Sequence, residues 1–421
     1  MISTLALLLV GRSSGPPREL QNYLRRPEPA YSWRRIENVQ NLPKLKLVSQ
    51  TWQGMRWEHE IIFASPARPV ATGTAVLFVT GGKPGVDDLM LLKTVVDQAG
   101  LPTAVLFDIP NQPIWGMSED DLIAHTFEKY LETGDPTWPL LFPMVKSTIK
   151  AMDAIVAFTK TSSNPIKNFV VTGASKRGWT TWLVGAAGDK RVKGIAPLVI
   201  DNLNVAAQMK HQIESWGKYS EQIEEYTKRG LQAKLDTAEG RKLAAMVDPY
   251  SYRSRVTMPT LIVNGANDRY WTVDALSLYW GDLKQPKYSI VVPNAGHDLG
   301  DLQWAIRGVT AFARASAGAM RMPALEAKIE AETARIVRVG AGFSTMRVWA
   351  AESESRDFRE SQWSAIAEVK IDPPTSKPDA SRPEVRFGSS RKNRALFVEA
   401  EFQSGGLRFS LTTPVVVQLA R

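Results

Sequence analysis

The sequence predicts an α/β protein built on a doubly wound, mostly parallel sheet. Short apolar runs rich in Val, Ile and Leu alternate with helical segments as far as about residue 320, a rhythm typical of parallel strands joined by crossover helices. The runs are apolar almost throughout, as strands buried on both faces are. Gly, Asp, Ser and His residues follow directly after several of them, and ligands bind at that edge of such a sheet.

The elements can be placed in order along the chain. A hairpin is expected first, after a polar lead-in at 15–41, and single strands joined by helices follow it. A loop and helical region rich in aromatic residues precedes the second long helix. The expected strands are 45–51, 57–64, 74–80, 103–107, 169–172, 194–200, 260–264 and 288–292, and the expected helices are 87–99, 143–158, a run beginning near Arg177, and 302–315.

Two segments depart from this rhythm. The segment 203–247 is helical and charged and interrupts the strands, so we expect it to be an inserted helical cap on a core domain spanning 16–320. Beyond about residue 320 helical periodicity is weak, which predicts a small C-terminal β-sandwich domain over 321–421 with a packing, substrate-facing or adhesive role. Its expected strands are 336–350, 365–371, 384–387, 395–402 and 407–419.

The composition excludes some classes of site. The chain has 421 residues and no Cys, which rules out disulfides, thiolate metal sites and cysteine catalysis. Its net charge of +9 is spread along the chain without a basic run, so we expect a solvated surface and no nucleic-acid partner. No His pair has metal spacing and the glycines after residue 80 lack the phosphate-loop pattern. We therefore expect no metal and no cofactor.

The N-terminal residues give the available evidence on cellular location. Residues 1–10 are mostly apolar and uncharged, like the hydrophobic part of a signal peptide, but a basic start and a clean cleavage site are missing. A misassigned start is an equal alternative. We interpret 1–15 as a signal-peptide remnant and favour export, periplasmic or secreted, over the cytoplasm. The run is too short to span a bilayer, and nothing in the sequence indicates an oligomeric state.

Ser175 is expected at the apex of a sharp turn between a strand and a helix. Gly173 and Ala174 let the backbone bend tightly, so that the hydroxyl stands clear of the sheet, and the helix N-terminus offers free N–H groups to an oxyanion. This is the nucleophile elbow of α/β-hydrolases. The sequence departs from the usual G-x-S-x-G pattern, because Arg177 occupies the position of the second Gly and the glycine follows one residue later, at Gly178. The alternative interpretation is that Ser175 only caps the helix.

Two further residues complete a predicted triad. Asp268 and His297 follow Ser175 in the order nucleophile, acid, His that α/β-hydrolases use, and each comes after one of the last two strands. His297 would accept the Ser175 proton and return it to the leaving group, and Asp268 would orient the imidazole. Asp201, after the preceding strand, is the alternative acid. Of the other histidines, His211 lies in the cap and could approach a substrate.

The oxyanion hole is expected from two backbone N–H groups. One belongs to Lys176, directly after the nucleophile, and the other to Gly82, in the loop after strand 74–80. The alternative interpretation is that Gly82 only forms an ordinary turn and does not contribute to an oxyanion hole. The Lys176 ammonium could add to the hole or contact an anionic group of a substrate. Thirteen Trp residues make an aromatic cleft plausible, although each Trp is more often core; the candidates are Trp115, Trp138, Trp179 and Trp216.

Several strings resemble the PhoPQ-activated pathogenicity-related proteins. They are Phe107-Asp-Ile-Pro-Asn-Gln-Pro113, Trp138-Pro-Leu-Leu-Phe-Pro-Met144, Gly173-Ala-Ser-Lys-Arg-Gly-Trp-Thr-Thr-Trp182, Asn294-Ala-Gly-His297 and Arg356-Asp-Phe-Arg359. The resemblance implies an α/β-hydrolase core with a C-terminal β domain, often exported, and in that family the Arg–Gly pair after the nucleophile is the expected one. Glu28 stands where the family would have Asp. The family supplies no substrate.

The predicted function is a serine hydrolase that works through an acyl-enzyme, and we favour a carboxylesterase acting on a small-molecule or polymer-linked ester. The elbow also resembles that of glucuronoyl esterases, in which a basic residue follows the nucleophile as Lys176 does here, although Ala174 replaces their Cys. That resemblance hints at a carbohydrate-linked or acidic ester. The alternatives are an aminopeptidase-like or dipeptidyl-peptidase-like serine peptidase, and a secreted non-catalytic binding or signalling protein.

Overall fold

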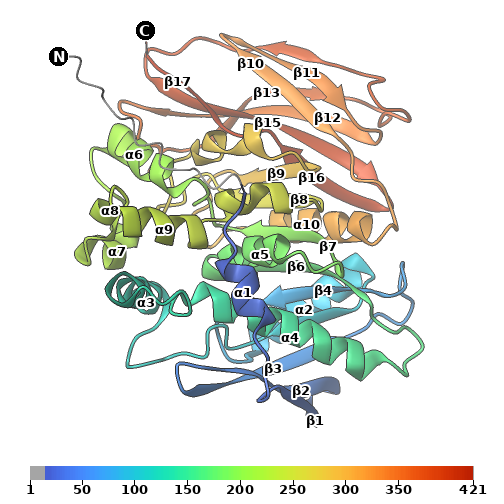
Figure 1. Ribbon diagram of the computed structural model, residues 1–421. Helices are drawn as coiled ribbons and strands as arrows, with labels where there is room; N and C mark the ends of the chain where they lie inside the picture. The colour runs from blue at the N-terminus through green and yellow to red at the C-terminus, as the bar shows by residue number, and fades with distance from the viewer. Residues whose placement is uncertain (1–14, 421) are drawn as a thin grey trace, which may run out of the picture.

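A single large sheet runs through the whole molecule. The computed structural model describes residues 15–420, so the apolar run at 1–10 lies outside the described residues. The strand order is β1-β2-β3-β5-β4-β6-β7-β8-β9-β16-β15-β12-β13, and Figure 1 shows the N-terminal strands at one end and the C-terminal strands at the other. The parallel centre consists of β4 (Thr74–Val79), β5 (Thr103–Leu106), β6 (Asn168–Ala174), β7 (Val192–Leu198), β8 (Thr260–Gly265) and β9 (Lys287–Val292).

Antiparallel strands form the N-terminal edge. They are β1 (Ser32–Val39), β2 (Leu42–Trp52) and β3 (Met55–Ala64), and β3 pairs with β5. The predicted hairpin is therefore confirmed. The sequence did not indicate β1, because its side chains are exposed or half-buried throughout and a strand without a buried face has no apolar alternation to read.

Helices cover both faces of the parallel strands because alternate side chains point to opposite faces. Ala75, Leu77 and Val171 belong to the core under one set of helices, whereas Val76 and Val170 belong to the core under the other. The first set is α1 (Glu19–Arg25), α4 (Leu141–Thr159) and α5 (Lys176–Ala187), and the second is α2 (Val86–Ala99) and α10 (Leu302–Ser316).

A helical insertion joins β7 to β8, where the cap was predicted, and lies beside α3 (Glu119–Thr133) (Figure 1). Its chain returns to the sheet through the short helix η2 (Pro249–Arg255), and η3 (Ala275–Leu278) and η4 (Trp280–Asp282) follow β8. The insertion contains α6 (Val205–Trp216), η1 (Glu221–Ile223), α7 (Glu224–Lys228), α8 (Leu231–Lys234) and α9 (Ala238–Val247).

The C-terminal strands form two layers. In one layer, β16 pairs with β9 at Thr412 and Ser289, so these strands continue the central sheet, and the other layer is a three-stranded sheet. Many of their apolar side chains share one core with the face covered by α10, and others, such as Ala351 and Phe397, form a separate cluster. The strands are β12 (Phe343–Ser353), β13 (Ser364–Lys370), β15 (Asn393–Ser404), β16 (Leu407–Thr412) and β17 (Val416–Gln418) in the first layer, and β10 (Leu325–Glu330), β11 (Thr333–Val339) and β14 (Glu384–Arg386) in the second.

The predicted runs 336–350 and 407–419 are each two strands rather than one. The second run is interrupted at Pro414, which has no N–H to donate to a strand ladder. Gly342 has φ +83°, and a Cβ there would lie 2.2 Å from the Gln403 carbonyl oxygen. Only Gly tolerates both the left-handed conformation and this close approach, so the chain turns between β11 and β12.

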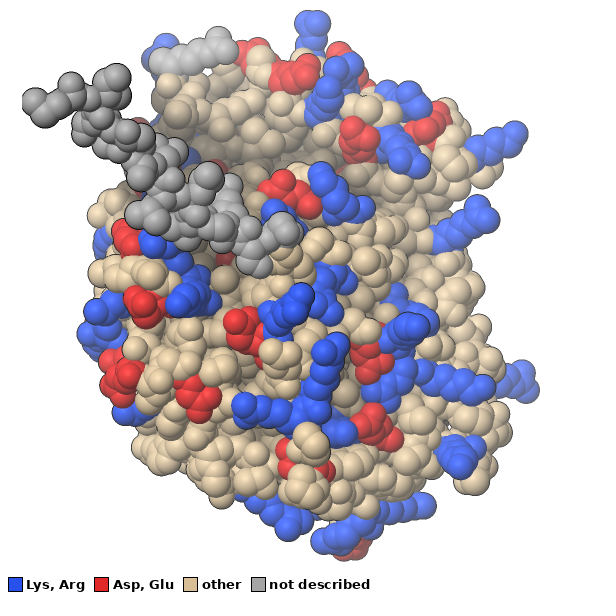
Figure 2. Space-filling model, viewed as in Figure 1, with Lys and Arg blue, Asp and Glu red and all other residues tan. Residues whose placement is uncertain are grey.

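Two further properties of the described residues are the hydrophobicity of the helices and the distribution of surface charge. No helix within residues 15–420 is both long enough and apolar enough to cross a membrane. Figure 2 shows Lys and Arg intermingled with Asp and Glu over the face in view, as the scattered charges of the sequence predict.

Candidate active site

The turn between β6 and α5 holds Ser175 in a strained conformation. Its φ is +57° and its ψ is −124°, a conformation that L-residues adopt only where the surroundings enforce it. The Ser175 N–H donates to the carbonyl of Leu198 on the neighbouring strand at 2.9 Å. The Ser175 side chain accepts no hydrogen bond from the first turn of α5, so the interpretation of this residue as a simple helix cap is wrong.

Glycines on both sides of Ser175 let the helix approach the sheet. A Cβ at Gly178 would lie 2.6 Å from Ile200 Cγ2 and 2.8 Å from the Leu198 carbonyl oxygen, and a Cβ at Gly173 would lie 2.9 Å from Arg177. These distances leave no room for a side chain. The glycine at 178 therefore provides the close approach of α5 to β7, and Arg177 occupies the position before it.

Arg177 fills a site of its own beneath the loop after β4. Its guanidinium donates to both carboxylate oxygens of Glu119 at 2.7 and 2.6 Å and to the Ile109 carbonyl at 2.5 Å. Burial opposes the charge of Glu119, but its hydrogen bonds and ion pair with Arg177 lower the pKa of this carboxyl. The guanidinium lies where a Cβ at Gly81 would be. The bidentate pair thus ties the elbow to the start of α3.

Three side chains from the carboxyl ends of β6, β8 and β9 form a hydrogen-bonded chain. His297 Nε2 lies 2.9 Å from Ser175 Oγ, and His297 Nδ1 lies 2.7 Å from Asp268 Oδ2. The second oxygen of Asp268 accepts the Tyr270 N–H at 2.9 Å. Asp268 is buried, whereas the imidazole is 30% exposed. This is the arrangement in which a carboxylate orients an imidazole and the imidazole activates a hydroxyl.

Asp201, the alternative acid, is hydrogen-bonded to other residues than His297. Its oxygens accept the Tyr279 hydroxyl at 2.6 Å and the Asn264 amide at 2.9 Å. Burial raises the pKa of Asp201 to about 7. Of the two candidate acids, only Asp268 contacts the imidazole, so the geometry favours Asp268.

Residues that the sequence did not single out surround the imidazole and Lys176. The Tyr270 ring lies against the His297 ring with centroids 4.3 Å apart. Lys176 Nζ forms an ion pair with Asp120 at 2.6 Å and donates to the Tyr270 hydroxyl at 3.3 Å. Burial opposes the ammonium charge, but Asp120 outweighs it and raises the pKa of Lys176. Its charge is already paired, so an anionic substrate group would have to compete with Asp120.

An apolar cavity of about 120 Å³ opens beside Ser175 and His297 and extends under the inserted helices. Lys176, Asp120, Tyr226 and Tyr270 are among its polar lining residues. Apolar side chains make up most of the remaining wall, among them Phe127, Trp179, Ile200, Met209, Leu231, Leu243 and Val247. The arrangement places a nucleophile at one end of a largely apolar chamber.

One of the four tryptophans proposed for a cleft lines this cavity. Trp179 does so, with its indole N–H donating to the Val247 carbonyl at 2.6 Å, and Trp271, which was not predicted, also lines it. The other three lie elsewhere. Trp115 and Trp138 pack against each other and Trp52, and Trp216 lies under the Arg359 guanidinium. None of these three side chains is among the residues that line the cavity.

The two residues expected to supply oxyanion N–H groups lie at the carboxyl ends of neighbouring strands. Lys176 is the first residue of α5, and Gly82 follows β4 and accepts a hydrogen bond from the Asp108 N–H at 3.0 Å. The space at the Gly82 Cα is open.

The remaining histidines have structural partners. His211 Nε2 lies 2.7 Å from Asp274, outside the cavity, and His59 is buried against Ser49, which lowers its pKa to about 4. His125 packs on Trp115. Within residues 15–420, no three His, Cys, Asp or Glu side chains are grouped closely enough to bind a metal ion.

Two comparisons relate the sequence to known proteins. The family model described as PhoPQ-activated pathogenicity-related protein matches residues 20–359. A relative from Dictyostelium discoideum, named Autocrine proliferation repressor protein A, is 35% identical over an alignment of 323 residues that covers 71% of this chain. The match covers only 64% of the length of that relative.

Solved structures resemble the fold. The acetyl xylan esterase from Paenibacillus sp. R4 superposes with a TM-score of 0.51 and 14% sequence identity, covering 71% of this chain and 91% of that one. At this identity the likeness shows the α/β-hydrolase fold alone.

Proposed function

The chain belongs to the PhoPQ-activated pathogenicity-related protein family, and from that premise we propose that it is a serine hydrolase acting on carboxylic esters. The observation that carries the proposal is the hydrogen-bonded chain from Ser175 through His297 to Asp268, at the mouth of an apolar cavity. A hydroxyl, an imidazole and a buried carboxylate in this order are the groups that acyl transfer requires.

The reaction has two halves. In the first, Ser175 Oγ attacks the ester carbonyl carbon while its proton passes to His297 Nε2, and the imidazolium returns that proton to the departing alcohol oxygen. In the second, water attacks the acyl-enzyme, gives a proton to His297 and releases the acid, and the proton returns to Ser175. Asp268 stabilises the imidazolium in both halves.

Backbone N–H groups stabilise the tetrahedral intermediates. We assign this role to the N–H of Lys176 and the N–H of Gly82, because the residue after the nucleophile and the loop after the third strand of the α/β core supply the hole in this fold. Each such donor contributes on the order of 3 kcal/mol to transition-state stabilisation. The hydrogen bond from the Ser175 N–H to the Leu198 carbonyl and the close packing at Gly178 hold the start of α5 at the elbow.

The cavity indicates the kind of acyl group. An imidazole that protonates the leaving alcohol must lie on the alcohol side of the ester, and His297 is partly exposed, so the alcohol faces solvent. The acyl part then points under the inserted helices, where the wall is mostly apolar. A volume of about 120 Å³ approaches the ~150 Å³ of an apolar cavity that holds benzene. The site therefore fits a phenyl-bearing or medium-length acyl group.

Probe labelling tests the nucleophile. We expect a fluorophosphonate to label the protein, and Ser175→Ala to abolish labelling together with hydrolysis of p-nitrophenyl esters. Ser215→Ala is the matched control, since its buried hydroxyl lies in α6 and has no hydrogen-bond partner among the described residues. Turnover of an aminoacyl-nitroanilide in preference to the esters would instead support a peptidase.

A second candidate function comes from the relative in Dictyostelium discoideum. Its name indicates a repressor of proliferation, so a signalling role without turnover is the alternative for this chain. The absence of both labelling and ester hydrolysis in folded protein would favour that role over the esterase.

A further inference from the structure

The loops that carry Asp268 and His297 both contact one short segment of the C-terminal region, residues 358–363. This segment lies between β12 and β13, about 60 residues beyond His297 in the sequence. Phe358 and Trp363 are buried, and they belong to one apolar cluster with Ala266, at the start of the acid loop, and Val291 of β9. The segment is therefore anchored on the strands that lead into the two loops.

Asn267 joins the acid loop to this segment. Its side-chain amide nitrogen donates to the carbonyls of Ser361 at 2.8 Å, Arg359 at 3.1 Å and Phe358 at 3.3 Å. An amide nitrogen has two hydrogens, so three carbonyls saturate it. Asn267 directly precedes Asp268, and these hydrogen bonds fix the backbone from which the carboxylate projects.

Asn294 joins the histidine loop to the same segment. Its side chain accepts the Trp363 N–H at 2.7 Å and donates to the Trp363 carbonyl at 2.9 Å. Asn294 has φ +55°, a conformation in which Asn is among the few tolerated residues besides Gly. It precedes His297 by three residues.

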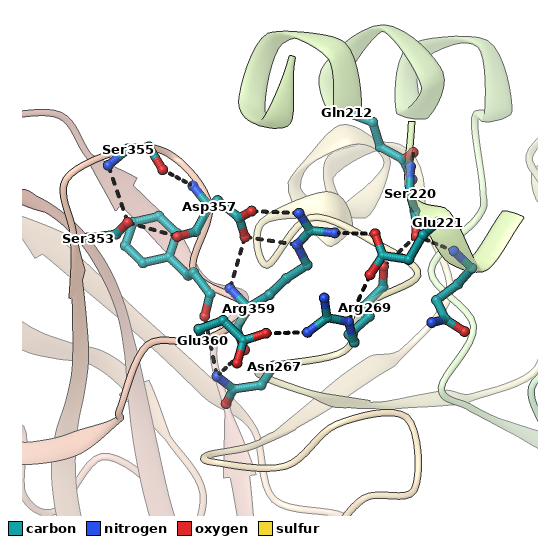
Figure 3. A network of polar contacts seen from close by, with 12 residues as sticks. Gln212, Ser220, Glu221, Asn267, Arg269, Ser353, Ser355, Asp357, Arg359 and Glu360 are labelled. Carbon is teal, nitrogen blue, oxygen red and sulfur yellow. Dashed lines mark hydrogen bonds and ion pairs between the residues drawn. The ribbon is translucent and has the colours of Figure 1, made fainter. Parts of the chain in front are cut away.

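A charged network extends the contact to the inserted helices (Figure 3). Arg359 pairs with Asp357 at 2.6 Å and with Glu221 of η1 at 2.9 Å. Arg269, directly after Asp268, pairs with Glu221 and with Glu360. The arginines thus bind the segment, the acid loop and the cap to one another.

We infer that the segment 358–363 positions both the base and the acid of the site, with Asn267 and Asn294 as the positioning residues; the catalytic consequence rests on the proposed function. The imidazole must meet Ser175 and Asp268 at once, and these groups come from three different loops. Loops move more readily than strands, and a misplacement of about 1 Å costs on the order of 100-fold in rate. The two loops share one direct backbone hydrogen bond, from the Asn267 N–H to the Ala295 carbonyl at 2.9 Å, and the segment that holds both of them from outside adds the side-chain contacts that restrict their separation.

The test compares asparagines that contact this region. Asn294→Gly keeps the backbone conformation and removes both side-chain hydrogen bonds, and Asn267→Ala removes three. Asn393→Ala is the matched control, because Asn393 donates to the Glu354 and Ser355 carbonyls of the same connection but touches neither catalytic loop. We expect kcat for a p-nitrophenyl ester to fall about 10- to 100-fold in the first two variants with KM within about twofold. In the control, kcat should stay within about twofold.

A second measurement does not depend on turnover. The downfield Nδ1 proton of His297, seen by NMR, reports its hydrogen bond to Asp268, and it should broaden or shift in Asn294→Gly and persist in Asn393→Ala. Unchanged kcat and an unchanged resonance in Asn294→Gly would overturn the inference, as would equal losses in the control. If the wild type hydrolyses no ester, the esterase proposal fails, while the resonance still decides the positioning role.

Discussion

Gly81 is a position near the site where one added methyl group should displace a buried side chain, that of Arg177. A Cβ there would lie 1.6 Å from Arg177 Nη2 and 2.0 Å from Cζ, whereas a Cβ at the adjacent Gly82 would have nothing within 4 Å. Gly81→Ala must therefore expel the guanidinium or shift the loop, and Gly82→Ala need do neither. The two variants carry the same chemical change one residue apart.

The loss of stability in Gly81→Ala can be estimated from the contacts that Arg177 makes. Its side chain is 9% exposed and makes two hydrogen bonds to Glu119 and one to the Ile109 carbonyl. Overpacking costs about 1–3 kcal/mol, and losing a partner from a fully buried ion pair costs about 3–5 kcal/mol. Glu119 is 40% exposed, so water compensates part of the second loss. We expect Gly81→Ala to lower the free energy of unfolding by about 3 kcal/mol.

Urea unfolding followed by fluorescence measures this difference. Gly82→Ala should lose less than about 1 kcal/mol, the ordinary range for a surface substitution. In an Arg177→Ala background the clash is gone, so Gly81→Ala should then cost far less, and the coupling between the two sites should exceed about 1 kcal/mol. A Gly81→Ala protein as stable as the wild type, or strictly additive effects, would refute the packing argument.

Three further expectations concern other parts of the site. Burial raises the pKa of Asp201 from 3.8 to about 7, so the folded state holds this proton more tightly than the unfolded state does. The free energy of unfolding should therefore include the full contribution of Asp201 below pH 3.8 and lose it as pH rises through 7, by about 4 kcal/mol in all. Asp201→Asn should accordingly flatten the pH dependence of urea unfolding between pH 4 and 8; an unchanged slope would contradict this. Ala244→Leu, inside the cavity wall, should shift ester preference toward acetyl by about tenfold, whereas Ala245→Leu on the same helix should not; equal profiles would exclude the acyl-side assignment. Lys176→Met leaves the Asp120 carboxylate without its cation, with the Tyr226 hydroxyl still donating to it at 2.9 Å, and should cost about 3 kcal/mol. Asp120→Asn should restore part of that loss in the double variant; a double variant less stable than Lys176→Met would show that the ion pair is not the cause.

Much of the fold could be predicted because its signals are local. Each central strand is a run of a few apolar residues, and the turn around Ser175 depends on small neighbours within three positions. The resemblance to the family, confirmed by the match over 20–359, also rests on such short strings. The elements that the sequence did not predict lack such local signals: β1 has no buried face, and no apolar pattern marks the turn at Gly342.

The candidate site was predicted in part. Ser175, Asp268 and His297 were indicated by their order and by their places after strands, and the structure brings them into contact. Tyr270 lies two residues beyond Asp268, so its position was a usable signal. Asp120 gave none, because its pairing with Lys176 joins α3 to α5 across 56 positions of sequence.

By itself the sequence determined the alternation of strands and helices, the sharp turn at Ser175 and the order of the reacting groups, because neighbours within a few residues dictate these features. Only the tertiary structure placed Asp268, rather than Asp201, against His297, left Trp115, Trp138 and Trp216 outside the cavity lining, and joined the C-terminal strands to the central sheet. Those outcomes depend on which surfaces meet when distant segments pack. A short stretch of sequence does not indicate which distant segment it contacts, so these contacts are known only from the packed structure.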